Sequence, residues 1–226
     1  LLRGVRGQGE VVVIAHRGAA ASAPENTLAS VQRAIDEGAD FVEIDVQETA
    51  DGEIAVLHDS DLMRVAGVDL KIWDATVERL AGIDIGSWFA PEFHGERVPL
   101  LRDVLSRARG SAKVMIELKY YGHDIALAQR AVDIVEGLAQ AGNVVAMSLE
   151  YDQVRRMREL RPQWTLGLLT AKAVGDLTTV DADFLAVNAG IATRAFVRRA
   201  HARGKKVYVW TINDPVQMFP MLNLGV

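Results

Sequence analysis

The chain has 226 residues, of which 50% are hydrophobic and 24% are charged, and its formal net charge is −5 at pH 7. Length and composition are those of an ordinary globular protein and allow one α/β barrel, while the acidic balance argues against a general nucleic-acid binder. The absence of cysteine excludes disulfides and thiolate-bound metals, and no apolar run reaches the length of a membrane-spanning helix.

The beginning of the chain predicts a β-α-β unit followed by a hairpin. Residues 11–15 form a short apolar run, typical of a strand that is buried on both faces of a parallel sheet. A helix is expected at 28–38, where a glycine stops it, and a second strand at 41–46. An Asp-Gly pair then indicates a tight turn, so strand 53–57 should fold back antiparallel beside the preceding strand.

The rest of the chain predicts an alternation of strands and helices after an irregular insertion. The insertion covers 60–97, with a helical turn at 76–80. Further strands are expected at 113–118, 144–147, 165–169, 184–187 and 206–211. Further helices are expected at 99–109, 125–141, 151–160 and 193–203, and a last one from Asp214-Pro215, which Pro220 should disturb.

This alternation favours a parallel α/β fold, and seven parallel strands are counted when the hairpin strand is left out. Eight would make a closed (β/α)8 barrel. We therefore expect one TIM-type barrel domain over residues 1–226, with a small insertion at 60–97. The chain has no initiator Met and stops on Val226, so we also expect an excerpt whose final strand lies beyond its C-terminus.

Polar residues recur where the predicted strands end, and in such barrels that end carries the active site. Glu43 and Asp45 are two apart on one strand and therefore point to the same side, and Glu117 and Lys119 repeat this spacing. Three neighbouring carboxylates repel one another unless a cation compensates. Oxygen ligands without cysteine suit Mg²⁺ or Ca²⁺ better than zinc.

Two imidazoles and two cations are expected at the same end. His16 and His58 suit a general acid and a general base. Arg17 and Lys119 supply positive charge for an anionic group, and Arg can bind phosphate in a bidentate fashion. A hard cation, two anion-binding residues and two imidazoles together describe hydrolysis of a phosphate ester, most simply a phosphodiester.

The chain resembles the glycerophosphodiester phosphodiesterase family in motifs that cover nearly its whole length. In order, they are HRGAAASAPENTLAS, FVEIDVQETADGEIAVLHD, RVPLLRDVL, IELK, LGLLT and VYVWTIND. The combination of HRG, PENT, ExD and HD at these spacings is highly specific. The family is similar in fold to phosphatidylinositol-specific phospholipase C, a TIM-type barrel. The resemblance implies metal-dependent hydrolysis of small glycerophosphodiesters to sn-glycerol 3-phosphate and an alcohol.

The resemblance also implies a role for each candidate residue. The implied acid–base pair is His16 and His58. The implied ligands of one divalent cation, Mg²⁺ or Ca²⁺, are Glu43, Asp45 and Glu117. The implied substrate-binding residues are Arg17 and Lys119 for the phosphate and Trp210 for the glycerol. Glu25 and Asn26 either stabilise a helix start or orient His16 and Arg17, and the second role is favoured. The insertion corresponds to the segment that shapes the entrance for substrate.

Several alternatives stay open at this point. The carboxylates of Glu43 and Asp45 could pair with Arg17 and Lys119 without a metal. The sequence does not decide which histidine is the acid, or whether water or a neighbouring substrate hydroxyl attacks. Competing functions are a lipid phosphodiesterase of the lysophospholipase D type and a non-catalytic phosphodiester-binding barrel. The aromatic residues that could admit a lipid are Trp73, Trp88, Phe89 and Phe93.

The resemblance departs from the family at the end of the chain, where the family continues with a strand of the type GxIITD. The YYGHD segment after IELK is similar to family members that are fused to a membrane domain. We therefore expect a soluble domain, cytoplasmic or extracytoplasmic, whose membrane association would need a part outside this chain. The sequence assigns no oligomeric state and no alcohol moiety.

Overall fold

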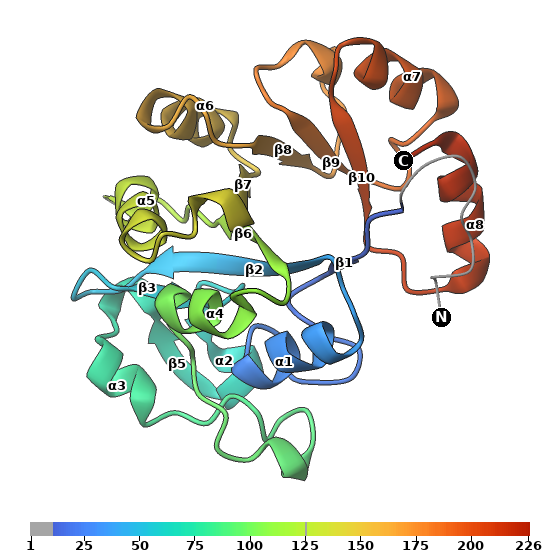
Figure 1. Ribbon diagram of the computed structural model, residues 1–226. Helices are drawn as coiled ribbons and strands as arrows, with labels where there is room; N and C mark the ends of the chain where they lie inside the picture. The colour runs from blue at the N-terminus through green and yellow to red at the C-terminus, as the bar shows by residue number, and fades with distance from the viewer. Residues whose placement is uncertain (1–10, 125) are drawn as a thin grey trace.

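The computed structural model describes residues 11–124 and 126–226 and has a curled parallel sheet at its centre (Figure 1). The strand order is β1-β2-β6-β7-β8-β9-β10, and all neighbours on this path are parallel. The strands are β1 (Ile14–Ala15), β2 (Phe41–Glu48), β6 (Lys113–Leu118), β7 (Val144–Ser148), β8 (Leu166–Thr170), β9 (Phe184–Asn188) and β10 (Lys206–Trp210). These are the seven parallel strands that the sequence predicts, although β1 is shorter than 11–15.

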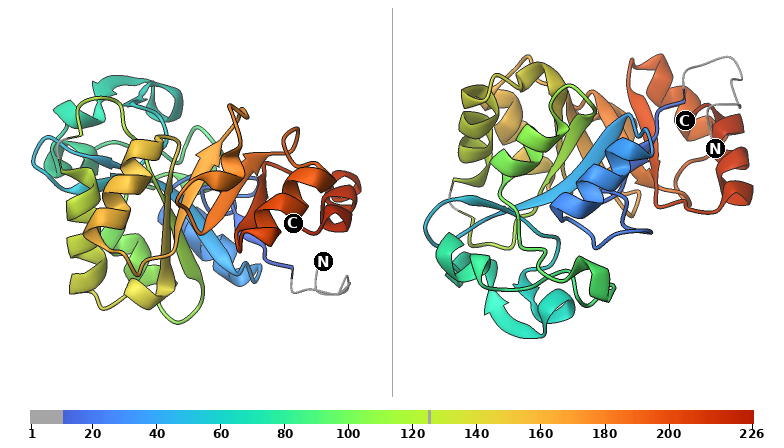
Figure 2. Two further views of the ribbon diagram at one scale, coloured as in Figure 1. Left: turned by 90° about the horizontal axis from the view of Figure 1, so that it is seen from above. Right: turned by 60° about the horizontal axis from the view of Figure 1, so that its bottom comes forward.

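Helices connect the strands and cover the outer side of the sheet (Figures 1 and 2). The connecting helices are α1 (Leu28–Asp36), α4 (Leu101–Ala108), α5 (Leu127–Gly137), α6 (Tyr151–Leu160) and α7 (Arg194–Ala202), while α8 (Pro215–Leu224) follows the last strand. Their apolar faces pack on outward-pointing strand residues such as Val42, Ile44 and Val46, which are fully buried. Helix and sheet therefore share one core, as the alternating pattern predicts.

Two helices differ from the sequence-based expectation. The helix predicted at 125–141 ends at Gly137, because the chain turns at Ala139, whose φ is 54°. The beginning of that prediction, Ile125, lies outside the described residues. The prediction that Pro220 disturbs the last helix is wrong, since α8 runs through it. α8 buries none of its residues, so water can reach the carbonyl that Pro220 leaves without a donor.

The inward-facing side of the sheet is apolar at its base. A cluster of buried residues fills it, namely Met115, Met147, Leu169, Phe184 and Ala186. The Phe184 ring occupies the space where a side chain at Gly167 would lie. The polar residues of β2 and β6 therefore lie next to a layer of packed apolar side chains, as in the interior of a packed barrel.

The predicted hairpin is confirmed, and the insertion after it has more structure than expected. β3 (Ile54–Val56) pairs antiparallel with β2, with Val56 opposite Val46. The insertion contains the strands β4 (Asp61–Leu62) and β5 (Val68–Lys71) and the helices α2 (Met63–Ala66) and α3 (Val77–Ala81). It also contains two short 3-10 helices, η2 (Ile72–Asp74) and η3 (Pro91–Phe93). β4 and β5 form a small sheet of their own, and a separate apolar cluster lies beneath them. The insertion is thus a packed unit beside the barrel.

The curled sheet stays open on one side. Across residues 11–124 and 126–226, β1 pairs only with β2 on the sheet path, and β10 only with β9. In the same residues, no helix is both long and apolar enough to cross a membrane.

Candidate active site at the C-terminal ends of the strands

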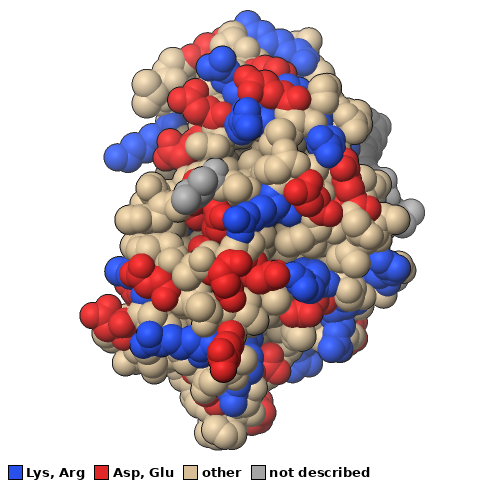
Figure 3. All heavy atoms as spheres, turned by 90° about the vertical axis from the view of Figure 1, so that its left-hand side faces the viewer, with Lys and Arg blue, Asp and Glu red and all other residues tan. Residues whose placement is uncertain are grey.

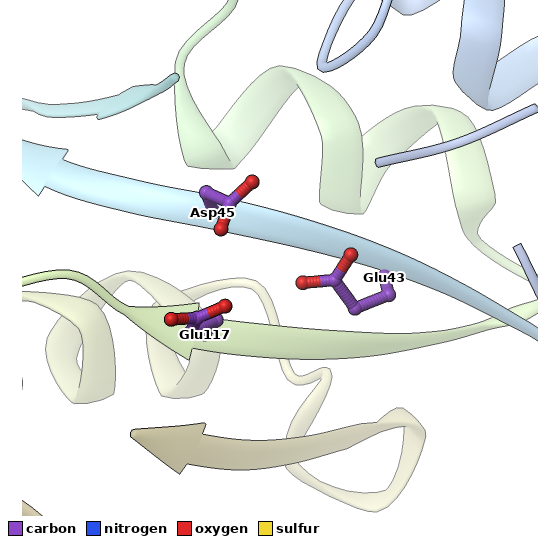
Figure 4. A group of neighbouring side chains, drawn as sticks. All are labelled: Glu43, Asp45 and Glu117. Carbon is purple, nitrogen blue, oxygen red and sulfur yellow. The ribbon is translucent and has the colours of Figure 1, made fainter. Parts of the chain in front are cut away.

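Three carboxylates converge between β2 and β6 (Figure 4). Glu43 and Asp45 lie on the same face of β2, and Glu117 of β6 is the register partner of Asp45. One oxygen from each carboxylate lies within 4.8 Å of the others, and all three side chains are buried. The two-residue spacing and the parallel register together produce this cluster.

The acidic cluster has the properties of a site for a hard cation. Glu43 Oε1 and Asp45 Oδ1 are buried and have no hydrogen-bond partner within residues 11–124 and 126–226. Burial, followed by the charges of Asp45 and Glu117, raises the pKa of Glu43 well above its usual value. Burial and the charge of Asp45 likewise raise the pKa of Glu117 to about 7. A divalent cation with oxygen ligands would relieve both the repulsion and the missing contacts, so the residues present fit one.

The loop after β1 holds two of these carboxylates in place. The main-chain N–H of Arg17 donates to Glu43 Oε2 at 2.8 Å, and the Asn26 side-chain amide donates to Asp45 Oδ2 at 2.8 Å. Arg17 and Asn26 both adopt left-handed backbone conformations, with φ values of 54° and 56°. Such conformations are disfavoured for residues with a side chain and gather at functional sites. Here they aim the donors at the carboxylates.

The two expected cations lie beside the acidic cluster. Lys119 Nζ donates to Glu117 Oε1 at 3.0 Å and lies 3.8 Å from Asp45 Oδ1. Arg17 pairs with Glu25 at 3.0 Å and lies 3.4 Å from Asp45 Oδ2. Of the ion pairs considered as an alternative to a metal, those of Asp45 with Arg17 and Lys119 exist, whereas no ion pair of the described residues includes Glu43. They nevertheless leave one oxygen of Asp45, and one of Glu43, without a hydrogen bond.

His16 follows β1 and belongs to the same electrostatic environment. Its pKa is lowered by burial and by the charge of Arg17, while Asp45 and Glu25 act in the opposite direction. The charge of His58 also lowers the pKa of His16. His16 Nδ1 lies 3.4 Å from the hydroxyl of Thr211.

His58 follows the hairpin strand β3 and is held by the next residue. Its Nδ1 lies 2.7 Å from Asp59 Oδ1, and a carboxylate can only accept there, so Nδ1 carries the proton. Burial works to raise the pKa of Asp59, but hydrogen bonds from Arg64 and His58 outweigh it and lower that pKa. An ionised Asp59 therefore orients the ring and leaves Nε2 free to exchange a proton.

The remaining predicted residues also lie near the strand ends. Trp210 is the last residue of β10 and packs against the inner apolar cluster, with its Nε1 buried and unpartnered. Glu25 accepts a hydrogen bond from the Arg17 guanidinium at 3.0 Å. Asn26, by contrast, contacts Asp45 and not His16 or Arg17 through its side chain. The PENT segment thus orients one cation and one carboxylate.

Two residues that were not expected from the sequence contact the His58 segment. Gln47 Nε2 donates to the carbonyls of Leu57 and Asp59 at 2.6 and 2.8 Å. It follows Glu43 and Asp45 at the same two-residue spacing, so the strand pattern already contained its signal. Arg64 donates to Asp59 and Glu25 from the insertion, and no periodicity there marks it.

β2 runs toward the left side of Figure 1, which faces the viewer in Figure 3. Lys and Arg side chains are interleaved with Asp and Glu side chains over that face. Proteins that bind nucleic acids generally have a clustered basic surface instead. The face drawn in Figure 3 does not have such a clustered basic surface.

Carboxylates, imidazoles and cations at the C-terminal ends of parallel strands are the arrangement of a TIM-type barrel enzyme. Solved structures agree: an Oleispira antarctica phosphodiesterase in complex with the product sn-glycerol-3-phosphate aligns over 96% of this chain and 90% of that chain, with 27% identity and a TM-score of 0.88. A glycerophosphodiester phosphodiesterase from Agrobacterium tumefaciens aligns over 95% and 92%, with 26% identity and a TM-score of 0.82. The predicted TIM-type α/β fold is confirmed.

Residues 16–226 match the model of the glycerophosphoryl diester phosphodiesterase family. Glycerophosphodiester phosphodiesterases are also among its curated relatives. That of Bacillus altitudinis is 31% identical over 95% of this chain and 91% of its own, and that of Bacillus subtilis is 30% identical over 96% and 81%. The chain therefore belongs to the glycerophosphoryl diester phosphodiesterase family, as its motifs indicate, and is a phosphoric diester hydrolase.

Proposed function

We propose that the protein hydrolyses glycerophosphodiesters to sn-glycerol 3-phosphate and an alcohol, with one divalent cation, Mg²⁺ or Ca²⁺, held by Glu43, Asp45 and Glu117. The unpartnered, buried oxygens of that cluster carry the proposal. The relatives named glycerophosphodiester phosphodiesterase and the product bound to the Oleispira protein support the substrate class.

Two cations and one aromatic residue are placed to bind the substrate. Arg17 and Lys119 flank the acidic cluster and would hold the phosphate oxygens, Arg17 through its planar guanidinium. When bound, a divalent cation neutralises the charge that develops on the phosphate. Trp210, half-buried at the end of β10, would lie against the glycerol.

The two imidazoles divide the proton transfers between them. The lowered pKa of His16 keeps its ring neutral at neutral pH, as a general base that receives the proton of the nucleophile must be. His58 donates its Nδ1–H to Asp59, whose negative charge offsets the positive charge of a doubly protonated ring. His58 Nε2 would therefore deliver the proton to the leaving alcohol.

The experiment is hydrolysis of glycerophosphocholine, followed by the release of glycerol 3-phosphate. We expect turnover with Mg²⁺ or Ca²⁺, none in excess chelator, and at least an approximately 100-fold loss in His16→Ala with unchanged thermal melting. His201→Ala is the matched control, because His201 is exposed on α7. Full activity in excess chelator, or in the His16→Ala protein, would contradict the mechanism.

A lipid substrate is the second candidate, and the exposed side chains of the insertion favour testing it. Trp88 is 43% exposed and Met63 is 51% exposed. The Arg64 guanidinium lies 5.8 Å from the Trp88 ring centroid, which connects this apolar surface to the site. If a lysophospholipid chain rests there, Trp88→Ala should raise KM for lysophosphatidylcholine and leave KM for glycerophosphocholine unchanged. Equal effects on both substrates would exclude an acyl-chain contact.

A further inference from the structure

Arg64 connects the insertion to both sides of the active site. Its Nε donates to Asp59 Oδ2 at 2.6 Å, while Nη1 and Nη2 donate to the two oxygens of Glu25 at 3.0 and 2.7 Å. Three of its N–H donors therefore contact two carboxylates: that of Asp59, five residues away in the sequence, and that of Glu25, 39 residues away. Arg64 lies on α2, which also places its guanidinium beside Trp88.

Each of those carboxylates contacts a residue of the proposed machinery. Asp59 accepts from the His58 ring at 2.7 Å, and Glu25 accepts from the Arg17 guanidinium at 3.0 Å. Arg64 itself contacts neither His58 nor the three clustered carboxylates in any of the hydrogen bonds or ion pairs of the described residues. Its influence on them is therefore indirect.

Other residues hold the main chain around His58 by hydrogen bonds, so the contribution of Arg64 concerns the imidazole ring and not the backbone. Gln47 donates to the carbonyls of Leu57 and Asp59, and the Tyr121 hydroxyl donates to the carbonyl of His58 at 2.6 Å. These contacts fix the backbone but not the direction of the imidazole. The ring is directed by the Asp59 carboxylate, whose second oxygen is held by Arg64.

We propose that Arg64 is a positioning residue for the catalytic acid: through Asp59 it fixes the tautomer and orientation of His58, and through Glu25 it links that acid to the phosphate-binding Arg17. The proposal rests on the function proposed above. It makes the insertion a part of the active site. Arg suits this position because its rigid, planar guanidinium directs three N–H donors at two carboxylates, a geometry that a Lys ammonium cannot reproduce.

The first test measures turnover of glycerophosphocholine by Arg64→Ala and Arg64→Lys. We expect kcat to fall about 10- to 100-fold in Arg64→Ala, as is usual when an orienting partner of a functional group is lost, with KM changed less than kcat. Arg64→Lys should recover only part of the loss, and added guanidinium should partly rescue Arg64→Ala. Arg79→Ala, an exposed residue on α3 of the same insertion, should retain wild-type kcat.

Leaving-group dependence separates a positioning role from general damage. The p-nitrophenyl ester of glycerol 3-phosphate expels an alcohol that needs little protonation, so it should be about tenfold less sensitive to Arg64→Ala than glycerophosphocholine. The metal-induced rise in melting temperature should be unchanged in Arg64→Ala. An equal loss with both esters, or a wild-type kcat, would overturn the proposal.

Nitrogen-15 NMR of the histidine rings provides a readout that does not need turnover. In the wild-type protein, His58 should be held as the Nδ1–H tautomer, and in Arg64→Ala it should become a mixture of tautomers. If the wild-type protein fails to hydrolyse glycerophosphodiesters but His58 responds in this way, the proposed function is wrong and the positioning role stands. An unchanged His58 tautomer in Arg64→Ala contradicts the positioning role itself.

Discussion

Asn26 contacts Asp45 at two points: its amide nitrogen donates to Asp45 Oδ2 at 2.8 Å, and its amide oxygen accepts from the main-chain N–H of Asp45 at 3.2 Å. Both residues are fully buried. The pair of hydrogen bonds fixes the carboxylate plane of Asp45. The Asp45 carboxylate lies near those of Glu43 and Glu117, and its Oδ1 has no hydrogen-bond partner among the described residues.

Removing the side-chain amide of Asn26 should weaken metal binding without abolishing it. Asn26→Gly is the cleanest change, because Asn26 has a φ of 56° and glycine tolerates that conformation. We expect affinity for Mg²⁺ or Ca²⁺ to fall about 10- to 100-fold, as when partners of metal ligands are lost elsewhere. Isothermal titration calorimetry measures this. Affinity equal to that of the wild-type protein would show that Asp45 needs no orientation or is not a ligand.

Metal binding should strengthen as pH rises through the titration of Glu117. The pKa of Glu117 is raised to about 7 by burial and by Asp45, so between its usual value of 4.5 and about 7 the folded protein binds more protons than the unfolded chain. The metal-free protein should therefore lose stability as pH rises through this window. A ligating carboxylate must be deprotonated, so the stabilisation by metal should grow over the same window.

Thermal melting at a series of pH values, with and without saturating Mg²⁺, tests both predictions: the fall in stability of the metal-free protein and the growing stabilisation by metal as pH rises. Glu117→Gln provides the control, since it should remove the part of the pH dependence that comes from this group. A metal-induced rise in melting temperature that is constant from about pH 5 to pH 8 would contradict the assignment of Glu117 as a ligand.

Local sequence spacing predicted the acidic cluster because strand alternation is a local property. Glu43, Asp45 and Glu117 needed only the two-residue period and a parallel register, and the structure has both. Arg64 could not be found this way. Its partner Glu25 lies 39 residues earlier, and their contact depends on how the insertion packs against the barrel. Such a contact has no periodic signal in the sequence.

The local apolar pattern also failed to predict where α5 ends and that α8 continues through Pro220. Apolar spacing continues through Leu138 and Ala139, but the left-handed conformation of Ala139 ends α5 earlier. Pro220 lies inside α8, but no residue of this helix is fully buried, so water can reach the carbonyl that loses its N–H donor. In both places tertiary packing or solvent, and not intrinsic propensity, decides the outcome.

The inner floor of the barrel should tolerate little added volume at Gly167. A Cβ there would overlap the Phe184 ring, so Gly167→Ala should lower the free energy of unfolding by about 1–3 kcal/mol, as overpacking of a core usually does. The double variant with Phe184→Leu should recover part of this loss, because the two changes share one space. Chemical denaturation measures both. Additive losses in the double variant would show that the strain lies elsewhere.

Lys119 should oppose metal binding while supporting catalysis. Its Nζ lies 3.0 Å from Glu117 and 3.8 Å from Asp45, so it supplies positive charge that a bound cation would otherwise provide. In Lys119→Met the metal-free protein should be destabilised by about 3 kcal/mol, because buried carboxylates lose their partner. Its stabilisation by saturating Mg²⁺ should exceed that of the wild-type protein, whereas turnover should collapse with the loss of the proposed phosphate-binding group.

The matched control is Lys113→Met, at the exposed beginning of the same strand, β6. It removes an equal charge far from the carboxylate cluster along the strand and should leave metal binding and turnover unchanged. The contrast isolates the local Coulomb effect from the change in net charge, because screening weakens distant exposed charges far more than buried neighbours. Weaker metal binding in Lys119→Met than in Lys113→Met would mean that Lys119 organises the ligands and does not compete with the cation.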